Sequence, residues 1–264
     1  SNSLLCVGLD PQMDRIPDSF KRQNSPYFDF CKAIVDATHE LVCCFKPQAA
    51  YFSAVGAEDQ LEKLVSYIKE QHSSIPVILD AKRGDIGSTA ALYAKEAYER
   101  YGADAVTVNP YLGFESIEPY MKYEDKGIVV LCRTSNPGSD WLQKDKKDAV
   151  PVYQRVAKQV ADWNKEDQFV LVTGATYPEE LGEVRKIVGR MPLLVPGIGA
   201  QGGDIESVLE VGLDQKAQGL IISSSREILY AHEKSNKDRP SDSEKLSEAG
   251  IVARQTRDMI NQFR

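Results

Sequence analysis

Short apolar runs recur along this 264-residue chain and alternate with stretches in which apolar residues lie three or four positions apart. The short runs, many of them rich in β-branched residues, are typical of buried strands, whereas the wider spacing is typical of helices with one buried face. The predicted strands cover residues 4–9, 41–46, 76–82, 104–109, 127–133, 169–174, 192–196 and 219–223. Strands and helices that alternate in this way predict repeated βα units and a parallel sheet.

Eight such units in a chain of this length favour an α/β fold in which the sheet closes on itself, a (β/α)8 TIM barrel, with residues 1–264 forming one domain. An open, doubly wound sheet is the alternative architecture. Two stretches are less regular than the rest. We expect residues 135–148 to form a mobile loop over the barrel mouth, and residues 235–243 to form a polar connection before a last helix.

Charged residues follow several of the predicted strands. Asp80 and Lys82 end the third strand, and because side chains alternate along a strand they face the same way. An acid and a base inside a barrel are costly unless they pair or have a function. Asp10, Lys46 and Arg226 end three other strands, so a barrel would bring all five to one mouth. A purely structural Asp80–Lys82 ion pair is the alternative, but it does not need these companions.

A glycine-rich segment follows the seventh predicted strand. Gly197, Gly199 and Gly202 match the G-x-G-x-x-G pattern of dinucleotide-binding folds, but the next strand is followed by Arg226 where such folds carry an acid. An NADP-dependent oxidoreductase is therefore only an alternative interpretation. In a barrel, the same segment and the start of a helix after the eighth strand form a phosphate site, to which Gln201 and Arg226 would donate. The sequence therefore predicts a substrate that carries a phosphate.

Composition narrows the classes of partner. The net charge of −7 and the pI near 5.2 argue against nucleic acid and anionic membranes, but they allow a small anionic substrate. No apolar stretch approaches the ~20 residues of a membrane span. The five cysteines form no C-x-x-C pair and the three histidines lack metal-ligand spacing. We therefore expect a reducing, cytoplasmic location and no metal site.

Four segments together resemble the orotidine 5'-phosphate decarboxylase family. They are residues 7–10 (VGLD), 45–47 (FKP), 80–86 (DAKRGDI) and 196–203 (PGIGAQGG), and residues 134–138 (TSNPG) are similar to the longer bacterial branch of that family. The resemblance runs from the first strand to Arg226. It implies a TIM barrel that needs no metal or cofactor and converts orotidine 5'-phosphate to uridine 5'-phosphate and CO2, the last step of UMP biosynthesis.

The resemblance also implies roles for individual residues. Lys46, Asp80, Lys82 and Asp85 match the family's alternating charged catalytic network, and Asp85 and Thr89 would enter the site of a neighbouring subunit, so we expect a homodimer. The implied substrate-binding residues are Asp10 on a ribose hydroxyl, Thr89, Ser135 on the pyrimidine, Pro196, Ser225, and Gln201 with Arg226 on the phosphate. A helix N-cap is the alternative for Thr89, and a turn is the alternative for Ser135.

The chemistry explains why a lysine is needed. Loss of CO2 from C6 of the pyrimidine leaves a carbanion in the ring plane, and we expect the Lys82 ammonium to stabilise this charge and then protonate C6. A magnesium-dependent sugar-phosphate decarboxylase or synthase of the same superfamily shares D-x-K-x-x-D. However, those enzymes carry a metal-binding acid where this chain has Lys46, which would repel the ion. A non-catalytic nucleotide-binding barrel is the other alternative.

Overall fold

The eight predicted strands are all present in the computed structural model, which describes residues 2–198, 204–234 and 242–264. The barrel strands are β1 (Leu5–Leu9), β2 (Cys44–Pro47), β3 (Ile78–Arg83), β4 (Ala105–Val108), β5 (Gly127–Arg133), β8 (Phe169–Thr173), β9 (Leu193–Pro196) and β10 (Leu220–Ser224). All the pairings between them are parallel.

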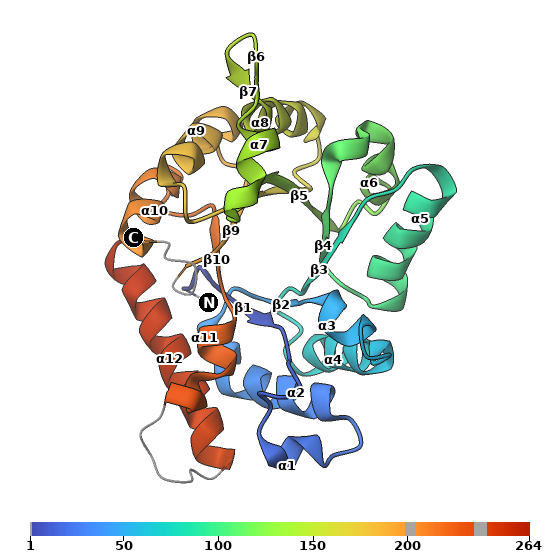
Figure 1. The fold of residues 1–264 in the computed structure, drawn as a ribbon, viewed down its shortest axis with the longest axis vertical. Helices are drawn as coiled ribbons and strands as arrows, with labels where there is room; N and C mark the ends of the chain where they lie inside the picture. The colour runs from blue at the N-terminus through green and yellow to red at the C-terminus, as the bar shows by residue number, and fades with distance from the viewer. Residues whose placement is uncertain (1, 199–203, 235–241) are drawn as a thin grey trace.

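The sheet is closed. Its strands run in the order β2-β1-β10-β9-β8-β5-β4-β3, and the bridges Phe45–Val77 and Gln48–Asp80 join the two outer strands, β2 and β3. Figure 1 looks into this ring of strands and shows the helices arranged around it. The predicted TIM barrel is therefore confirmed, and the alternative of an open, doubly wound sheet is wrong.

The longer helices cover the outside of the barrel (Figure 1) because they present an apolar face to the strands. In α4 (Glu58–Gln71), for example, Leu61, Leu64, Val65 and Ile68 are buried at the expected three-to-four spacing. The other α-helices are α1 (Asp18–Lys21), α2 (Pro26–Thr38), α3 (Ala49–Ser53), α5 (Gly87–Lys95), α6 (Glu118–Met121), α7 (Asp140–Gln143), α8 (Val152–Trp163), α9 (Pro178–Val188), α10 (Ile205–Gly212), α11 (Arg226–Leu229) and α12 (Asp242–Gln262).

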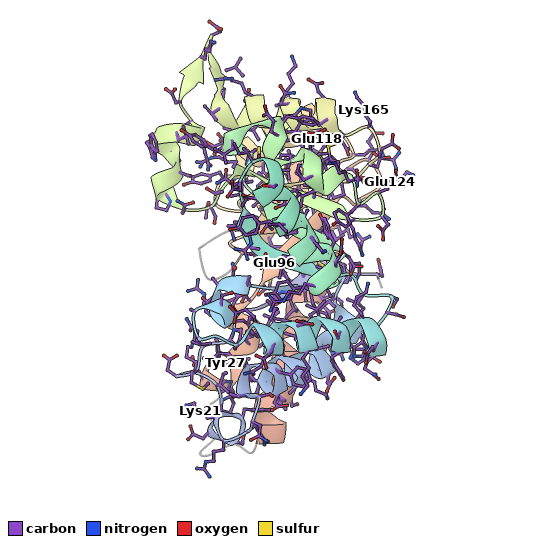
Figure 2. The ribbon with its side chains drawn as sticks, turned by 90° about the vertical axis from the view of Figure 1, so that its right-hand side faces the viewer. Lys21, Tyr27, Glu96, Glu118, Glu124 and Lys165 are labelled. Atoms are coloured by element: carbon purple, nitrogen blue, oxygen red, sulfur yellow. The ribbon has the colours of Figure 1, made fainter. Side chains whose placement is uncertain are left out.

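Short helical turns complete the connections. They are η1 (His39–Leu41), η2 (Glu96–Arg100), η3 (Pro110–Leu112), η4 (Phe114–Ser116), η5 (Pro137–Ser139) and η6 (Ala231–Lys234). Glu96 begins η2 on the side of the molecule shown in Figure 2, where its carboxylate accepts two hydrogen bonds from Arg83. Arg83 thus points out of the barrel, opposite to its neighbour Lys82. None of the helices that the structure describes is long and apolar enough to cross a membrane.

Most strand boundaries lie within two residues of the prediction, and two regions differ from it by more. The second strand begins at Cys44 rather than residue 41, because His39–Leu41 form a 3-10 turn. Residues 135–148 are not one irregular loop, since they contain η5, α7 and β6 (Lys146–Lys147), which pairs with β7 (Val150–Pro151) in a protruding hairpin (Figure 1). Most of the polar stretch 235–243 lies outside the described residues.

Candidate active site

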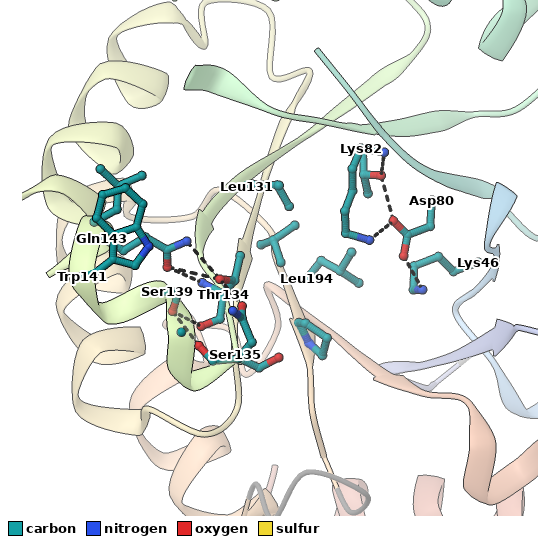
Figure 3. Close-up of a pocket in the computed structure, with 16 residues that line it drawn as sticks. Lys46, Asp80, Lys82, Leu131, Thr134, Ser135, Ser139, Trp141, Gln143 and Leu194 are labelled. Atoms are coloured by element: carbon teal, nitrogen blue, oxygen red, sulfur yellow. Dashed lines mark hydrogen bonds and ion pairs between the residues drawn. The ribbon is translucent and has the colours of Figure 1, made fainter. Parts of the chain in front are cut away.

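A cavity of about 560 Å³ opens at the carboxyl ends of the strands. This volume is within the usual range for sites that bind small molecules. Its walls come from several strands and from the 134–143 segment: Lys46, Asp80, Lys82, Thr107, Leu131, Thr134, Ser135, Asn136, Gly138, Ser139, Trp141, Leu142, Gln143, Val172, Leu194 and Pro196. The charged groups lie on one wall and the Thr134–Ser135 region lies opposite (Figure 3).

Asp80 is the centre of the charged wall. Its Oδ2 atom accepts a hydrogen bond from Lys46 Nζ at 2.9 Å, and its Oδ1 atom accepts one from Lys82 Nζ at 2.6 Å. Asp80 and Lys46 are buried, whereas the Lys82 side chain is 47% exposed and faces the cavity (Figure 3). The carboxylate therefore holds the more accessible ammonium group at a fixed place in the pocket.

The backbone around Lys82 is unusual. Lys82 has a φ of 48°, in the left-handed region that a non-glycine residue rarely adopts, and the pairing of β3 with β4 shifts register between Leu79 and Arg83. The hydroxyl of Thr107 accepts hydrogen bonds from the N–H groups of Ala81 and Lys82, each at 2.9 Å, and donates one to Asp80 at 2.9 Å. Such a conformation costs about 1–3 kcal/mol and persists where its surroundings enforce it, often at functional sites.

The electrostatics keep Asp80 and Lys46 ionised near neutral pH. Burial on its own would raise the pKa of Asp80, but the ammonium groups of Lys46 and Lys82 lower it well below its ordinary value. For Lys46, burial acts to lower the pKa, and the carboxylates of Asp80 and Asp10 outweigh burial and raise it. The cavity wall itself thus presents two lysine ammonium groups around one carboxylate, which suits an anionic ligand.

Asp10 follows β1, beside the last strand of the barrel. Its Oδ2 accepts a hydrogen bond from the Ser225 hydroxyl at 2.6 Å, while its buried Oδ1 has no partner among the described residues. Gly8 permits this approach, because a Cβ at that position would lie 2.8 Å from Ser225 Cβ. The free oxygen of Asp10 can accept a hydrogen bond from a ligand hydroxyl.

Ser135 lies on the wall opposite Asp80. It follows β5 directly and packs against the end of β8, where a Cβ on Gly174 would lie 2.7 Å from Ser135 Cα. The Ser135 carbonyl accepts a hydrogen bond from Thr176 at 3.1 Å. Ser135 therefore belongs to the cavity wall, and its role in reading a base stays a prediction.

The remaining predicted residues are placed as follows. Pro196 lines the cavity, whereas Arg226 is exposed at the start of α11 and Gln201 lies outside the described residues. Asp85 is half-buried and accepts a hydrogen bond from the N–H of Ile86, and Thr89 is exposed on α5, so neither lines this cavity within one chain. The alternative role for Thr89 is wrong, since the N-cap position of α5 is Ile86 and has no side-chain cap.

Within the described ranges, no cluster of His, Cys, Asp or Glu has an arrangement that would hold a metal ion. The β2 position of this site carries Lys46, whose ammonium lies 2.9 Å from Asp80. In this chain Asp80, the first carboxylate of the D-x-K-x-x-D motif, is therefore paired with two lysines.

Sequence reasoning missed two residues that shape the site. Thr107 is a lone polar residue within an apolar strand, and it has the parity of an inward-facing position, a signal that could have found it. Arg133 ends β5 and is completely buried, yet it does not line the cavity. Its partners are scattered over residues 134–180, so no local pattern indicated its role.

A TIM barrel with a carboxylate and two ammonium groups at its mouth defines an enzyme of the class that acts on small anionic substrates. Comparison with known proteins narrows this class. The family model described as "Orotidine 5'-phosphate decarboxylase / HUMPS family" matches residues 3–238, and the chain belongs to this family. It is a carboxy-lyase.

Similar proteins agree over the whole chain. An orotidine 5'-phosphate decarboxylase of Ralstonia pickettii is 57% identical over 265 aligned positions, which cover 100% of this chain and 95% of that protein. One from Dechloromonas aromatica is 55% identical, with the same coverage. The solved structure of Leishmania donovani OMP decarboxylase is 34% identical, with a TM-score of 0.82, and the match covers 99% of this chain and 94% of that one.

Proposed function

We propose that this protein decarboxylates orotidine 5'-phosphate to uridine 5'-phosphate in pyrimidine biosynthesis, without a metal or cofactor. Membership in the family and the names of its relatives support the reaction. The observation that carries the mechanism is the Lys82 ammonium, which Asp80 holds at 2.6 Å and which faces the cavity.

Lys82 supplies both stabilisation and a proton. When the bond between C6 and the carboxylate carbon breaks, CO2 leaves and the electron pair stays on C6, in the plane of the ring. A fixed ammonium stabilises this charge more than it stabilises the substrate, because the charge on C6 develops only as the bond breaks. Lys82 then donates a proton to C6, which yields uridine 5'-phosphate, and the neutral amine regains a proton from water.

Asp80 orients this ammonium and acts on the substrate as well. Its pKa lies well below the ordinary value, so it is a carboxylate when the substrate binds. Two carboxylates in one pocket repel, and this repulsion is relieved as the substrate carboxylate becomes CO2. Lys46 lies 2.9 Å from the other oxygen of Asp80 and helps to keep this carboxylate ionised.

The other predicted residues serve binding. The unpartnered oxygen of Asp10 suits a ribose hydroxyl, and Ser135 faces the base from the opposite wall. Arg226, Ser225 and Gln201 would hold the phosphate, with Pro196 beside them. Because the phosphate is remote from C6, its binding energy can be used to offset the repulsion between the substrate carboxylate and Asp80.

Turnover of orotidine 5'-phosphate with a chelator present tests the proposal, with Lys82→Ala as the variant. We expect metal-free turnover by the intact protein and a loss of about 10⁴-fold or more in the variant. Lys186→Ala, which removes a side chain that is 79% exposed, is the matched control and should keep full activity. Binding without turnover would favour the nucleotide-binding barrel, and turnover restored only by magnesium would favour the sugar-phosphate branch.

We also propose a homodimer in which Asp85 and Thr89 complete the partner's site. Large apolar side chains are exposed on the segments next to them: Ile86 is 56% exposed, Leu92 65% and Tyr111 78%. Large exposed apolar side chains clustered near an incomplete site are typical of an interface between subunits.

Mixing two inactive variants tests this shared site. A dimer of one Lys82→Ala chain and one Asp85→Ala chain would keep one site with both native residues, so random mixing should restore about a quarter of wild-type activity. Each variant alone should stay inactive. No recovery after subunit exchange, verified by mass, would contradict the exchange of Asp85 between subunits.

A further inference from the structure

Arg133 is the largest completely buried side chain in the described part of the protein. Its guanidinium donates to Glu180 on α9 through Nε, to Asp140 on α7 through Nη2 at 2.6 Å, and to Ser139 through Nη1. It also lies 3.8 Å from the centre of the Tyr177 ring. A buried cation is costly unless its donors are satisfied, and here the partners surround it on several sides.

A second cation extends the cluster. Lys144, just after α7, lies 3.1 Å from Glu180, and Glu180 is only 15% exposed. The cluster therefore holds two cations and two anions. Asp140 belongs to the segment 134–143, which lines the cavity, and Lys144 follows this segment directly. The burial of Arg133 acts to lower its pKa, but the carboxylates of Glu180 and Asp140 raise it overall, so the guanidinium stays charged.

Hydrogen bonds between side chains and backbone groups also fix the segment 134–143. Gln143 Oε1 accepts a hydrogen bond from the N–H of Thr134 at 2.9 Å, and Arg133 Nη1 donates to the carbonyl of Thr134 at 3.3 Å. Ser139 donates back to the carbonyl of Asn136 at 2.7 Å. These bonds, several of which are drawn in Figure 3, close residues 134–143 into a compact loop around the guanidinium.

Residues of this loop form part of the cavity wall, but Arg133 does not. Thr134, Ser135, Trp141 and Leu142 all line the cavity. A change at Arg133 or its carboxylate partners therefore reaches a ligand only through the position of the loop. The opposite, charged wall around Asp80 comes from other strands and shares no hydrogen bond with the cluster.

We propose that Arg133 is a positioning residue that holds the 134–143 loop against the barrel before any ligand arrives, so that the base-reading wall is preformed. The proposal rests on the proposed function, since it assigns this wall to the base of the nucleotide. A preformed wall strengthens binding of the base by removing the cost of ordering the loop. It does not strengthen binding of the ribose and phosphate.

Asp140→Asn tests the proposal, because Asp140 is half-exposed and its replacement should leave the fold intact. The probes are uridine 5'-phosphate and ribose 5-phosphate, which lacks the base. We expect the variant to bind the nucleotide about tenfold more weakly, the loss typical of a hydrogen bond to a charged group, and to bind ribose 5-phosphate within about twofold of wild type. Asp145→Asn, an exposed residue just beyond α7, is the matched control and should change neither.

Two further readouts separate positioning from simple loss of stability. Hydrogen exchange of residues 134–143 without ligand should rise in Asp140→Asn but not in Asp145→Asn, and Asp140→Glu should restore most of the affinity for the nucleotide. Equal weakening of both ligands, or no weakening of either, would overturn the proposal. Failure of the proposed function is distinct, since it would appear as absence of orotidine 5'-phosphate turnover in the wild-type protein.

Discussion

Thr107 and Thr173 are both buried threonines on barrel strands, but they differ in the partners of their hydroxyl groups. Thr107 makes three hydrogen bonds that tie Asp80 to the backbone of Ala81 and Lys82. The Thr173 hydroxyl is buried and has no partner among the described residues. Valine substitutions at the two positions therefore separate the loss of a hydrogen-bonded hydroxyl from the general effect of replacing a buried threonine by valine.

Thr107→Val should destabilise the protein by about 1–3 kcal/mol, because it leaves two N–H groups unpaired. It should also reduce kcat by about tenfold, since the backbone that presents Lys82 loses its support. Thr173→Val should leave both the stability and kcat close to wild type or raise the stability slightly. Chemical unfolding and steady-state kinetics measure both, and equal effects of the two substitutions would contradict the role of Thr107.

At the level of residues, the sequence predicted the charged residues that line the cavity, but not the residue and the backbone conformation that position them. Asp80 and Lys82 were predicted to face one way, and both line the cavity with Lys46. The left-handed backbone at Lys82 could not be predicted, because nothing in Ala81–Arg83 indicates a bulge. The bulge depends on Thr107, which lies on another strand and is 25 positions away from Lys82.

Among the elements, the junction between β5 and β8 determines where the cavity wall formed by residues 134–143 lies. The N–H of Gly174 donates to the carbonyl of Arg133 at 2.7 Å, and the Cα of Gly174 lies so close to Ser135 that no side chain fits between them. The two strands also shift register between Leu131 and Arg133. The start of the 134–143 loop is therefore fixed from the barrel side as well as through Arg133.

Gly174→Ala should push the Ser135 backbone into the cavity, because the new Cβ would lie 2.7 Å from Ser135 Cα. We expect a loss of about 1–3 kcal/mol in stability and a rise of about tenfold in KM. Gly138→Ala is the control for stability on the same loop, since its Cβ would meet no other protein atom closer than 3.8 Å, although Gly138 also lines the cavity. A KM unchanged by Gly174→Ala would show that this contact does not set the wall.

Element boundaries were predicted to within a few residues wherever a strand stood between polar segments. The second strand was the exception, because the apolar run from Leu41 to Phe45 does not distinguish a 3-10 turn from a strand. The 135–148 stretch was also misjudged. Its short elements depend on a buried arginine whose partners include Glu180, 47 positions away, and hydrophobic periodicity does not register such contacts.

For the whole molecule, stability should depend on pH through His72, whose ring stacks on that of His39. His39 and His72 cap the carboxyl ends of α2 and α4, and their rings stack with centroids 4.2 Å apart. The Nε2 atom of His72 is buried without a partner among the described residues. Burial, the neighbouring His39 and Lys32 lower the pKa of His72, although Asp36 acts in the opposite direction.

The sign of the effect follows from this lowered pKa. Below about pH 6.5 the unfolded chain takes up a proton at His72 that the folded chain does not, so the free energy of unfolding should fall as the pH drops from about 7 toward 5. His72→Phe keeps a ring in the stack and should flatten this dependence. The lowered pKa of Asp80 acts only below this window. The free energy of unfolding can be measured by urea titration at each pH. If it changed equally with pH in the wild type and in His72→Phe, the assignment would be contradicted.

The Asp10–Ser225 hydrogen bond joins residues 215 positions apart, across the line where β1 pairs with β10. During synthesis, β1 therefore leaves the ribosome long before β10, and until then the edge of β1 that pairs with β10 has no partner strand. The corner of the site that we assign to the ribose does not exist until the eighth barrel strand has been made. A chain cut short before β10 thus loses part of its active site as well as its closing strand, so the assembly of function and the closure of the barrel are one event.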